Sequence, residues 1–288
     1  MPTTPTTIKT WGEALDYTWR VKWKRMRSAK TNGINAAHVT EYCGRSLPLS
    51  RMTRAGWWME FKAELEDQNR SGSTINRILS AGTTVMRYTK LAGLHEHEVP
   101  AFQRAQEGEH RLVYFSKAEV DKLAAISRDI FRDTWGDNLA DAMLISAYIG
   151  CRQAELLKLK PDDVDHQFDQ IWIGGKPKNL TKSRNCRNIP LNPKIRQIVM
   201  DRLDHHRLFG DDWNNKDQLY RSFLKVRKLA GFSDDYVWHS LRHSFGTWLG
   251  VVSHPRQVME ALGHSTIDQS LKYCKATDEA VRSAVLAI

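Results

Sequence analysis

The sequence predicts a mainly α-helical protein with one small β-hairpin sheet, an α+β fold. Apolar residues recur every three or four positions between residues 11 and 94, which is the period of amphipathic helices. Only residues 170–191 combine short β-type runs with a turn, at the glycine pair 174–175, and helical spacing returns beyond Pro193. With 41% hydrophobic residues in 288, the chain can bury real cores, in one large domain or two ordinary ones.

Residues 1–95 are expected to form a small all-helical domain. Their apolar side chains fall into three helical runs, Trp11-Ala14-Leu15-Trp19, Trp57-Trp58-Phe61-Leu65 and Ile75-Ile78-Leu79-Val85-Met86. Basic residues crowd the chain around Trp19 and Trp23, a mixture that suits phosphate contacts flanked by packing. A solvated helix face over buried tryptophans fits the same pattern equally well. The DNA-binding candidates are Arg20, Lys22, Lys24, Arg25, Arg27 and Lys30.

The overall charge favours nucleic acid as the partner. The formal net charge is +10 and the pI is about 9.5. A positive field attracts phosphate backbones over a Debye length, ~8 Å in physiological salt. A generically basic protein has the same composition, so charge alone leaves both interpretations open.

Residues 96–111 lose the apolar period, are rich in charge and contain Pro100 and Gly108, so they are interpreted as a linker between two domains. The second domain, residues 112–288, begins with a helix that Ser116 caps. A further helix around residues 139–148 stops at Gly150, a residue that easily adopts the left-handed conformation, and Arg152 follows directly.

Cysteine usage and the absence of targeting segments predict an intracellular protein. The four cysteines show no paired spacing, which argues against a disulfide framework and a zinc knuckle: Cys43, Cys151, Cys186 and Cys274. No stretch approaches the roughly 20 apolar residues that span a bilayer, and residues 1–10 lack the pattern of a signal peptide.

Several chemistry-bearing residues lie near the C-terminus, and each is weak alone. His239 and His243 have the spacing of a zinc-protease helix, but Ser240 stands where that site needs glutamate. A helix from Pro255 is expected to end at Gly263, before His264. Ser265 is then expected to cap a helix that carries Tyr273 two turns further on. A lone tyrosine there is more often a core residue than a nucleophile.

The combination of motifs is more specific than its parts. In order, the chain contains Gly150-Cys151-Arg152-Gln153-Ala154-Glu155-Leu156-Leu157, Lys182 in TKSRNCRNIPL, His239-x-x-Arg242-His243, Leu262-Gly263-His264, and Tyr273 nine residues after His264. This set resembles the tyrosine recombinases, the phage integrase family. The resemblance covers the whole second domain, and the helical first domain with TINRILS (residues 74–80) looks like the family's SAM-like core-binding domain.

The resemblance implies a role for each matched residue. Tyr273 would attack the scissile phosphate and form a 3′-phosphotyrosyl link, so neither a nucleotide cofactor nor a metal would be required. Arg152 and Arg242 would hold the phosphate. Lys182 would protonate the leaving 5′ oxygen, with Lys176 and Lys178 as alternatives in the same turn. The remaining matches are His239, for proton transfer from the tyrosine and a phosphate hydrogen bond; His264, as donor to a non-bridging oxygen; and Glu155, orienting Arg152 or His239.

The resemblance also implies partners and location. The expected partner is double-stranded DNA at a specific recombination site. The protein would bind it as a homotetramer, held together by exchange of a C-terminal helix at about 276–288. An accessory directionality factor is a further candidate partner, and no membrane is involved. The expected place is the cytoplasm of a bacterial or archaeal host, at the nucleoid. Integration or excision of a phage or mobile element is the leading role. A chromosome-dimer resolvase, a topoisomerase-like enzyme and a non-catalytic DNA-binding regulator are the alternatives.

Overall fold

A computed structural model of the chain describes residues 7–108, 112–132, 135–176, 186–213, 215–274 and 286. The chain divides into two compact units, Met1–His110 and Arg111–Ile288, named here the first and the second unit. Each unit buries a hydrophobic core of its own.

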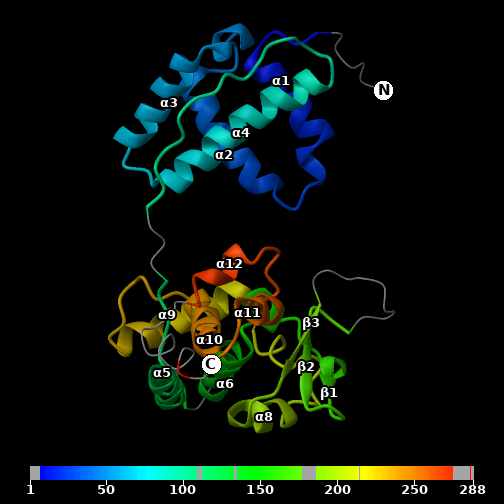
Figure 1. The fold of residues 1–288 in the computed structure, drawn as a ribbon, viewed down its shortest axis with the longest axis vertical. Helices are drawn as coiled ribbons and strands as arrows, with labels where there is room; N and C mark the ends of the chain where they lie inside the picture. Colours follow the sequence, from blue (N-terminus) through cyan, green and yellow to red (C-terminus); the bar gives the residue numbers. More distant parts are fainter. Residues whose placement is uncertain are drawn as a thin grey trace. The chain divides into compact units, whose positions relative to one another are not determined.

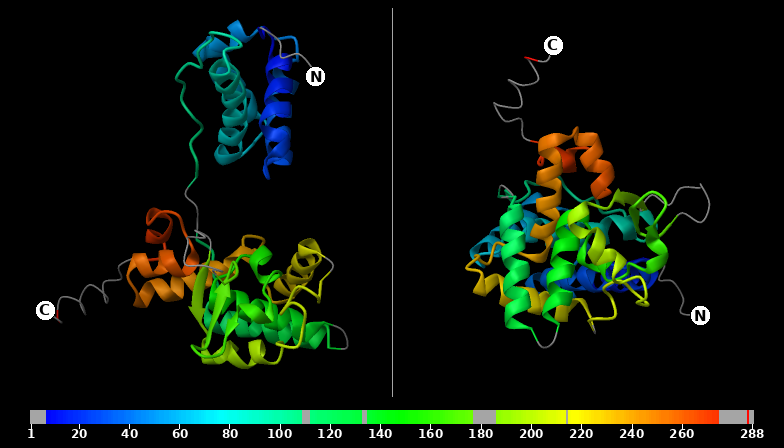
Figure 2. Two further views of the ribbon diagram at one scale, coloured as in Figure 1. Left: turned by 90° about the vertical axis from the view of Figure 1, so that its right-hand side faces the viewer. Right: turned by 90° about the horizontal axis from the view of Figure 1, so that it is seen from below.

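The first unit consists of helices. Trp11, Trp23 and Trp58 are fully buried in its core, and the helical spacing of the sequence predicted this for Trp11 and Trp58. In Figure 2, α1 and α4 lie side by side. The helices are α1 (Trp11–Val21), α2 (Ala29–Cys43), α3 (Ala55–Asp67) and α4 (Gly72–Leu91), with 3-10 turns at Trp23–Arg25 and Leu49–Thr53.

The segment after α4 has no regular structure up to residue 108, yet it is fixed to the first unit. The Asn76 side chain accepts a hydrogen bond from the Ala105 amide at 3.0 Å and donates one to the Ala105 carbonyl at 3.0 Å. Phe102 stacks on Trp58 with ring centroids 5.1 Å apart. The exposed connection expected at 96–111 is therefore anchored along much of its length, because one buried amide satisfies both backbone groups of Ala105.

The second unit combines helices with a three-stranded antiparallel sheet in the order β1-β2-β3. Ile171 pairs with Ile189, and both point into the core. Figure 1 shows the sheet at one side of the unit, and α5 and α6 lie together in Figure 2. This confirms the predicted fold class. The elements are α5 (Lys117–Ile130), α6 (Gly136–Ile149), α7 (Gln153–Leu156), β1 (Val164–Asp165), β2 (Gln170–Ile173), β3 (Arg187–Pro190), α8 (Pro193–Met200), α9 (Lys216–Leu229), α10 (Trp238–Val252), α11 (Pro255–Leu262) and α12 (Asp268–Leu271).

Most of the predicted helix ends in the second unit lie where the capping serine and the glycines of the sequence place them, with one exception. Ser116 caps α5, and Gly150 (φ 63°) and Gly263 (φ 65°) end α6 and α11 in the left-handed conformation, as predicted. The prediction for Ser265 was wrong. The amides of Ser270 and Leu271 bond the carbonyl of Ile267, so α12 begins later and ends before Tyr273.

No helix among the described residues is long and apolar enough to cross a membrane.

Candidate active site

One face of α10 forms the floor of the site. His239, His243, Gly246 and Gly250 follow each other at intervals of four, three and four residues, so they line one side of the helix. Leu241 on the other side is fully buried in the core of the second unit. The helix therefore presents two imidazoles and then two positions without side chains.

Tyr273 lies over this face. Its side chain is only 4% exposed and packs with Val258 and Leu262 of α11. A Cβ added at Gly246 would lie 2.8 Å from Cε1 of the tyrosine ring, and one added at Gly250 would overlap the Tyr273 carbonyl oxygen. The two glycines thus permit the close approach that holds Tyr273 in place.

The Tyr273 hydroxyl is hydrogen-bonded to His243, with 2.7 Å between the oxygen and Nδ1. Burial raises the pKa of Tyr273 to about 12, although the charges of Arg242 and Arg152 oppose that shift. Burial and nearby cations lower the pKa of His243 to about 3. At neutral pH a protonated phenol therefore meets a neutral imidazole, and the phenol can donate to a free ring nitrogen.

His264 flanks the tyrosine from another direction. Its ring stacks on that of Tyr273 with centroids 6.0 Å apart and planes 17° apart. Nδ1 of His264 lies 2.7 Å from the hydroxyl of Ser270, which is fully buried. Burial, followed by the charges of Arg242 and Lys272, lowers the pKa of His264 to about 4, so this ring is also neutral at pH 7.

Arg242 joins two helix ends beneath the site. It is 1% exposed; Nη1 donates to the Gly150 carbonyl at 2.6 Å and Nη2 to the Leu262 carbonyl at 2.5 Å. Carbonyls at helix C-termini lack partners within the helix and carry partial negative charge, which compensates a buried cation. Burial lowers the pKa of Arg242 to about 10, so the side chain stays charged at neutral pH.

Glu155 connects two arginines. Its Oε1 accepts from Nη1 of Arg152 and its Oε2 from Nη2 of Arg187, both at 2.9 Å, and Oε2 also accepts from the Arg152 backbone amide at 2.8 Å. Burial opposes ionisation, but these bonds outweigh it and lower the pKa of Glu155 to about 2. Arg187 is buried, whereas the Arg152 side chain is 48% exposed and open to a ligand.

Glu155→Gln is expected to destabilise the protein at pH 7, by less as the pH falls. A carboxylate whose folded pKa is lowered contributes stability above its unfolded pKa. That contribution is lost as the pH falls from about 4.5 towards about 2. Urea unfolding of both proteins at pH 7, 5 and 3 measures the difference in unfolding free energy. A difference that stays constant over this range would contradict the ion-pair network.

The structure brings most of the predicted site residues together. The charges of Arg152 and Arg242 act on the pKa values of His239, His264 and Tyr273 alike. Glu155 contacts Arg152, one of the two partners expected for it. His239 is exposed on α10, with its ring 4.6 Å from that of His243.

The structure describes one of the three lysines considered as the general acid. Lys182 and its alternative Lys178 lie outside the described residues. The other alternative, Lys176, donates to the Val164 carbonyl at 3.1 Å.

Three residues at the site were not singled out from the sequence. His243 stood in the zinc motif and in the family motif but was given no role of its own, although its four-residue offset from His239 places it on the same helix face. Arg187 served only as a marker for aligning Lys182. Ser270, the partner of His264, carried no sequence signal, because its role depends on how α12 packs.

One of the six basic candidates of the first unit, Lys22, lines a polar groove. This groove, between α2 and α4, has a volume of about 550 Å³ and is lined by Lys22, Asn35, Arg77 and Arg104 among others. Arg20 lies over the ring of Tyr17 and Lys22 over that of Tyr88. Four further candidates are exposed and do not line the groove, Lys24, Arg25, Arg27 and Lys30.

Comparisons with known proteins identify the family of the chain. Residues 114–280 match the phage integrase family model. Tyrosine recombinase XerC of Alcanivorax borkumensis is 27% identical over 227 residues, 73% of this chain and 71% of the relative. Tyrosine recombinase XerA of Thermococcus kodakarensis is 28% identical over 257 residues, 85% and 86% of the two chains.

A solved structure extends the likeness to the fold of the whole chain. The Tn1549 transposon integrase, in complex with a circular intermediate DNA, gives a TM-score of 0.76 at 17% identity and covers 97% of this chain and 99% of its own. The family model alone spans more than half of the chain and includes Arg152, His239, Arg242, His264 and Tyr273. The chain therefore belongs to the phage integrase family, the tyrosine recombinases, which are enzymes that cleave and rejoin DNA.

Proposed function

We propose that this recombinase cleaves DNA by attack of the Tyr273 hydroxyl on the scissile phosphate, to integrate or excise a phage or mobile element. The observation that carries the proposal is geometric: the ring of His264 stacks on that of Tyr273, and Arg242 bonds the carbonyl of Leu262, two residues before His264. Attack forms a 3′-phosphotyrosyl bond and releases a 5′ hydroxyl. Because an aryl oxygen leaves readily, the reverse step rejoins DNA without a nucleotide cofactor.

The two arginines neutralise the charge that develops on the phosphate. Arg242 uses two of its five N–H donors on carbonyls, which leaves others for a non-bridging oxygen. Arg152 is held from behind by Glu155, so its exposed guanidinium is oriented before DNA arrives. Such preorganised donors stabilise a transition state without reorganising during the reaction.

Two histidines and a lysine are proposed to supply the remaining hydrogen bonds and the proton for the leaving group. If the buried Ser270 hydroxyl donates to Nδ1 of His264, the ring proton sits on Nε2 and serves a non-bridging oxygen. His239, exposed on α10, is assigned a second phosphate hydrogen bond. Lys182 stays assigned to the leaving 5′ oxygen on the basis of its motif.

A covalent trapping experiment tests this function. Nicked duplexes with a randomised centre are incubated with the protein; cleavage near the nick releases a short strand, which prevents rejoining. The expected result is a DNA adduct that survives denaturation and enriches one sequence class. Complete absence of adduct from the whole pool, with folded and DNA-binding protein, would contradict the proposed chemistry.

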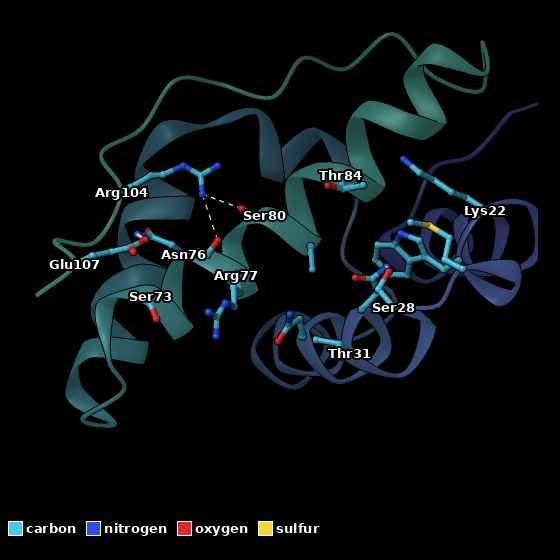
Figure 3. Close-up of a pocket in the computed structure, with 15 residues that line it drawn as sticks. Lys22, Ser28, Thr31, Ser73, Asn76, Arg77, Ser80, Thr84, Arg104 and Glu107 are labelled. Atoms are coloured by element: carbon cyan, nitrogen blue, oxygen red, sulfur yellow. Dashed lines mark hydrogen bonds between the residues drawn. The ribbon is translucent and has the colours of Figure 1, made fainter. Parts of the chain in front are cut away.

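The first unit is proposed to be the core-binding domain, and its groove is proposed to bind the DNA duplex. Figure 3 shows Arg77, Ser73 and Thr31 among the side chains that line it, while Arg104 bonds the Asn76 carbonyl and Ser80. Polar side chains on two helices with few carboxylates suit a polyanion whose base edges also need hydrogen-bond partners.

Arg77→Ala is expected to weaken DNA binding and to reduce the slope of log affinity against log salt by about one, since one phosphate contact is lost. The matched control is Arg87→Ala, an exposed arginine of the same helix that does not line the groove. Fluorescence anisotropy at several salt concentrations measures both slopes. Equal effects of the two variants would show that the groove has no special part in binding.

Gly250→Ala is expected to slow cleavage by about a hundredfold, because a misplacement near 1 Å is enough for such a loss. The new Cβ overlaps the Tyr273 carbonyl and displaces the nucleophile. The control is Gly56→Ala in α3, where a Cβ meets nothing within 4 Å. Single-turnover cleavage of the nicked duplex measures the rates. A normal rate for Gly250→Ala would contradict the proposed packing of Tyr273 against Gly250.

Assembly is proposed as a homotetramer on DNA, with helix exchange through residues 276–288, which lie outside the described residues except for Leu286. Deletion of 276–288 is the test. Loss of tetramers with retained DNA binding supports exchange, and normal recombination by the truncated protein excludes it. A chromosome-dimer resolvase is the alternative role, since the relatives include XerC as well as a transposon integrase.

A further inference from the structure

Cleavage by Tyr273 requires that the phenol lose its proton as the oxygen attacks phosphorus. We infer that His243 is the residue that accepts this proton, through Nδ1. The inference rests on the proposed function, because it assumes that Tyr273 is the nucleophile. It adds a catalytic residue to the set expected from the family motif, in which proton transfer from the tyrosine was assigned to His239.

Geometry carries the inference. The Tyr273 oxygen and Nδ1 of His243 are 2.7 Å apart, which is the distance of a strong hydrogen bond and lies within reach for direct proton transfer. Both partners are held firmly, since the tyrosine ring is 4% exposed and sits on Gly246, and His243 is half-buried on α10. His239 is one helical turn away and exposed, and its ring centroid lies 4.6 Å from that of His243.

Charge explains why the proton moves only when DNA is bound. Burial and then His239, Lys272, Arg242 and His264 lower the pKa of His243, so free enzyme keeps the imidazole neutral and the phenol protonated. A phosphodiester held by Arg152 and Arg242 brings a negative charge that offsets the positive charges of Lys272 and Arg242. The imidazolium is then less disfavoured, so DNA binding itself prepares the base.

The step balances without a further reactant. The Tyr273 oxygen bonds to phosphorus, its proton passes to Nδ1 of His243, the P–O5′ bond breaks, and the 5′ oxygen takes a proton from the general acid proposed above. On rejoining, the 5′ hydroxyl attacks phosphorus and loses its proton to that acid's conjugate base. The tyrosyl oxygen leaves and recovers its proton from His243.

Two substitutions separate removal of the base from loss of the hydrogen bond. His243→Leu removes both, and His243→Asn keeps an acceptor near the Nδ1 position but cannot take the proton. His206→Leu, at an exposed histidine between α8 and α9, is the matched control. Both His243 variants are expected to slow single-turnover cleavage by about a hundred- to ten-thousandfold, with unchanged DNA affinity. A control-like rate for His243→Leu overturns the inference.

A nucleophile of lower pKa tests the base function itself. With a fluorinated tyrosine at position 273, more phenolate forms without help, so the His243→Asn rate is expected to recover by about tenfold or more, while wild type changes little. Failure to recover, with DNA affinity and thermal stability intact, overturns the assignment of His243 as base.

A leaving-group substitution tells His243 apart from the general acid. When sulfur replaces the 5′-bridging oxygen, the leaving thiolate needs no proton, so a variant that lacks the acid recovers whereas the His243 variants stay slow. Recovery of the His243 variants on this substrate overturns the inference.

The Tyr273→Phe variant separates the two levels of the account. If it still forms the adduct, the proposed function fails. If it forms none and His243→Leu cleaves normally, only the inference fails.

Discussion

Tyr273→Phe is expected to form no covalent DNA adduct while it keeps its fold and its DNA affinity. The phenylalanine ring fills the same space against Val258 and Leu262, and only the hydroxyl bonded to His243 is lost. Losing one such hydrogen bond costs about 1 kcal/mol of stability. The chemical step, in contrast, loses its nucleophile altogether. Denaturing gels of trapped reactions measure the adduct, and thermal unfolding with anisotropy measures fold and affinity.

The control for this substitution is another tyrosine whose ring also contributes to the second unit. Tyr236 packs against Phe115 and Phe232, away from the α10 face that carries the histidines. Tyr236→Phe is expected to trap DNA as wild type does. An adduct that persists in Tyr273→Phe would show that another residue makes the bond.

Arg242→Lys is expected to have the second largest effect, because this arginine serves both the phosphate and the fold. A lysine keeps the charge but cannot bond Gly150, Leu262 and a phosphate oxygen in the same fixed plane. Loss of one aligned donor in a transition-state site costs about 10²–10³ in rate. A carbonyl left without a partner costs a further ~1–3 kcal/mol of stability.

Arg152→Lys is the matched comparison. The Arg152 side chain is half-exposed and forms an ion pair with Glu155. Its replacement is therefore expected to slow cleavage with a small change in stability. Cleavage rates and urea unfolding of both variants give the two readouts. An Arg242→Lys protein that cleaves at the wild-type rate would contradict the assignment of Arg242 to the phosphate.

Local chemistry made much of the fold predictable. Helical spacing located the buried Trp11 and Trp58, although Trp19 of the same pattern is 38% exposed, and two glycines predicted where α6 and α11 end. Those ends matter for the site, because Arg242 donates to the carbonyl of Gly150 and to that of Leu262, the residue before Gly263. The motif order then identified Tyr273, which on its own is a buried aromatic residue of ordinary appearance.

The contacts between distant residues were not predictable in the same way. Tyr273 and His243 are thirty positions apart, and Glu155 and Arg187 are thirty-two, so their pairing depends on how α10, α12 and β3 pack. The expected cap at Ser265 failed for the same reason. The sequence around Ser265 was favourable for a helix cap. In the structure, however, Ser270 bonds the ring of His264 and α12 begins only at Asp268.

The face of α10 is an intermediate case. The intervals between His239, His243, Gly246 and Gly250 are visible in the sequence and predict one shared side of a helix. What the sequence pattern does not reveal is that the ring of Tyr273 packs on Gly246 and its backbone on Gly250. Small residues next to catalytic ones on a helix face therefore indicate that another segment packs closely there.

Mapping the covalent bond tests the central claim most directly. The trapped adduct is digested with protease and nuclease, and the peptide that carries the residual nucleotide is sequenced by mass spectrometry. The account predicts a single modified residue, Tyr273, linked to the 3′ phosphate of the cleaved strand. A nucleotide on any other residue, or a link to the 5′ phosphate, would contradict it.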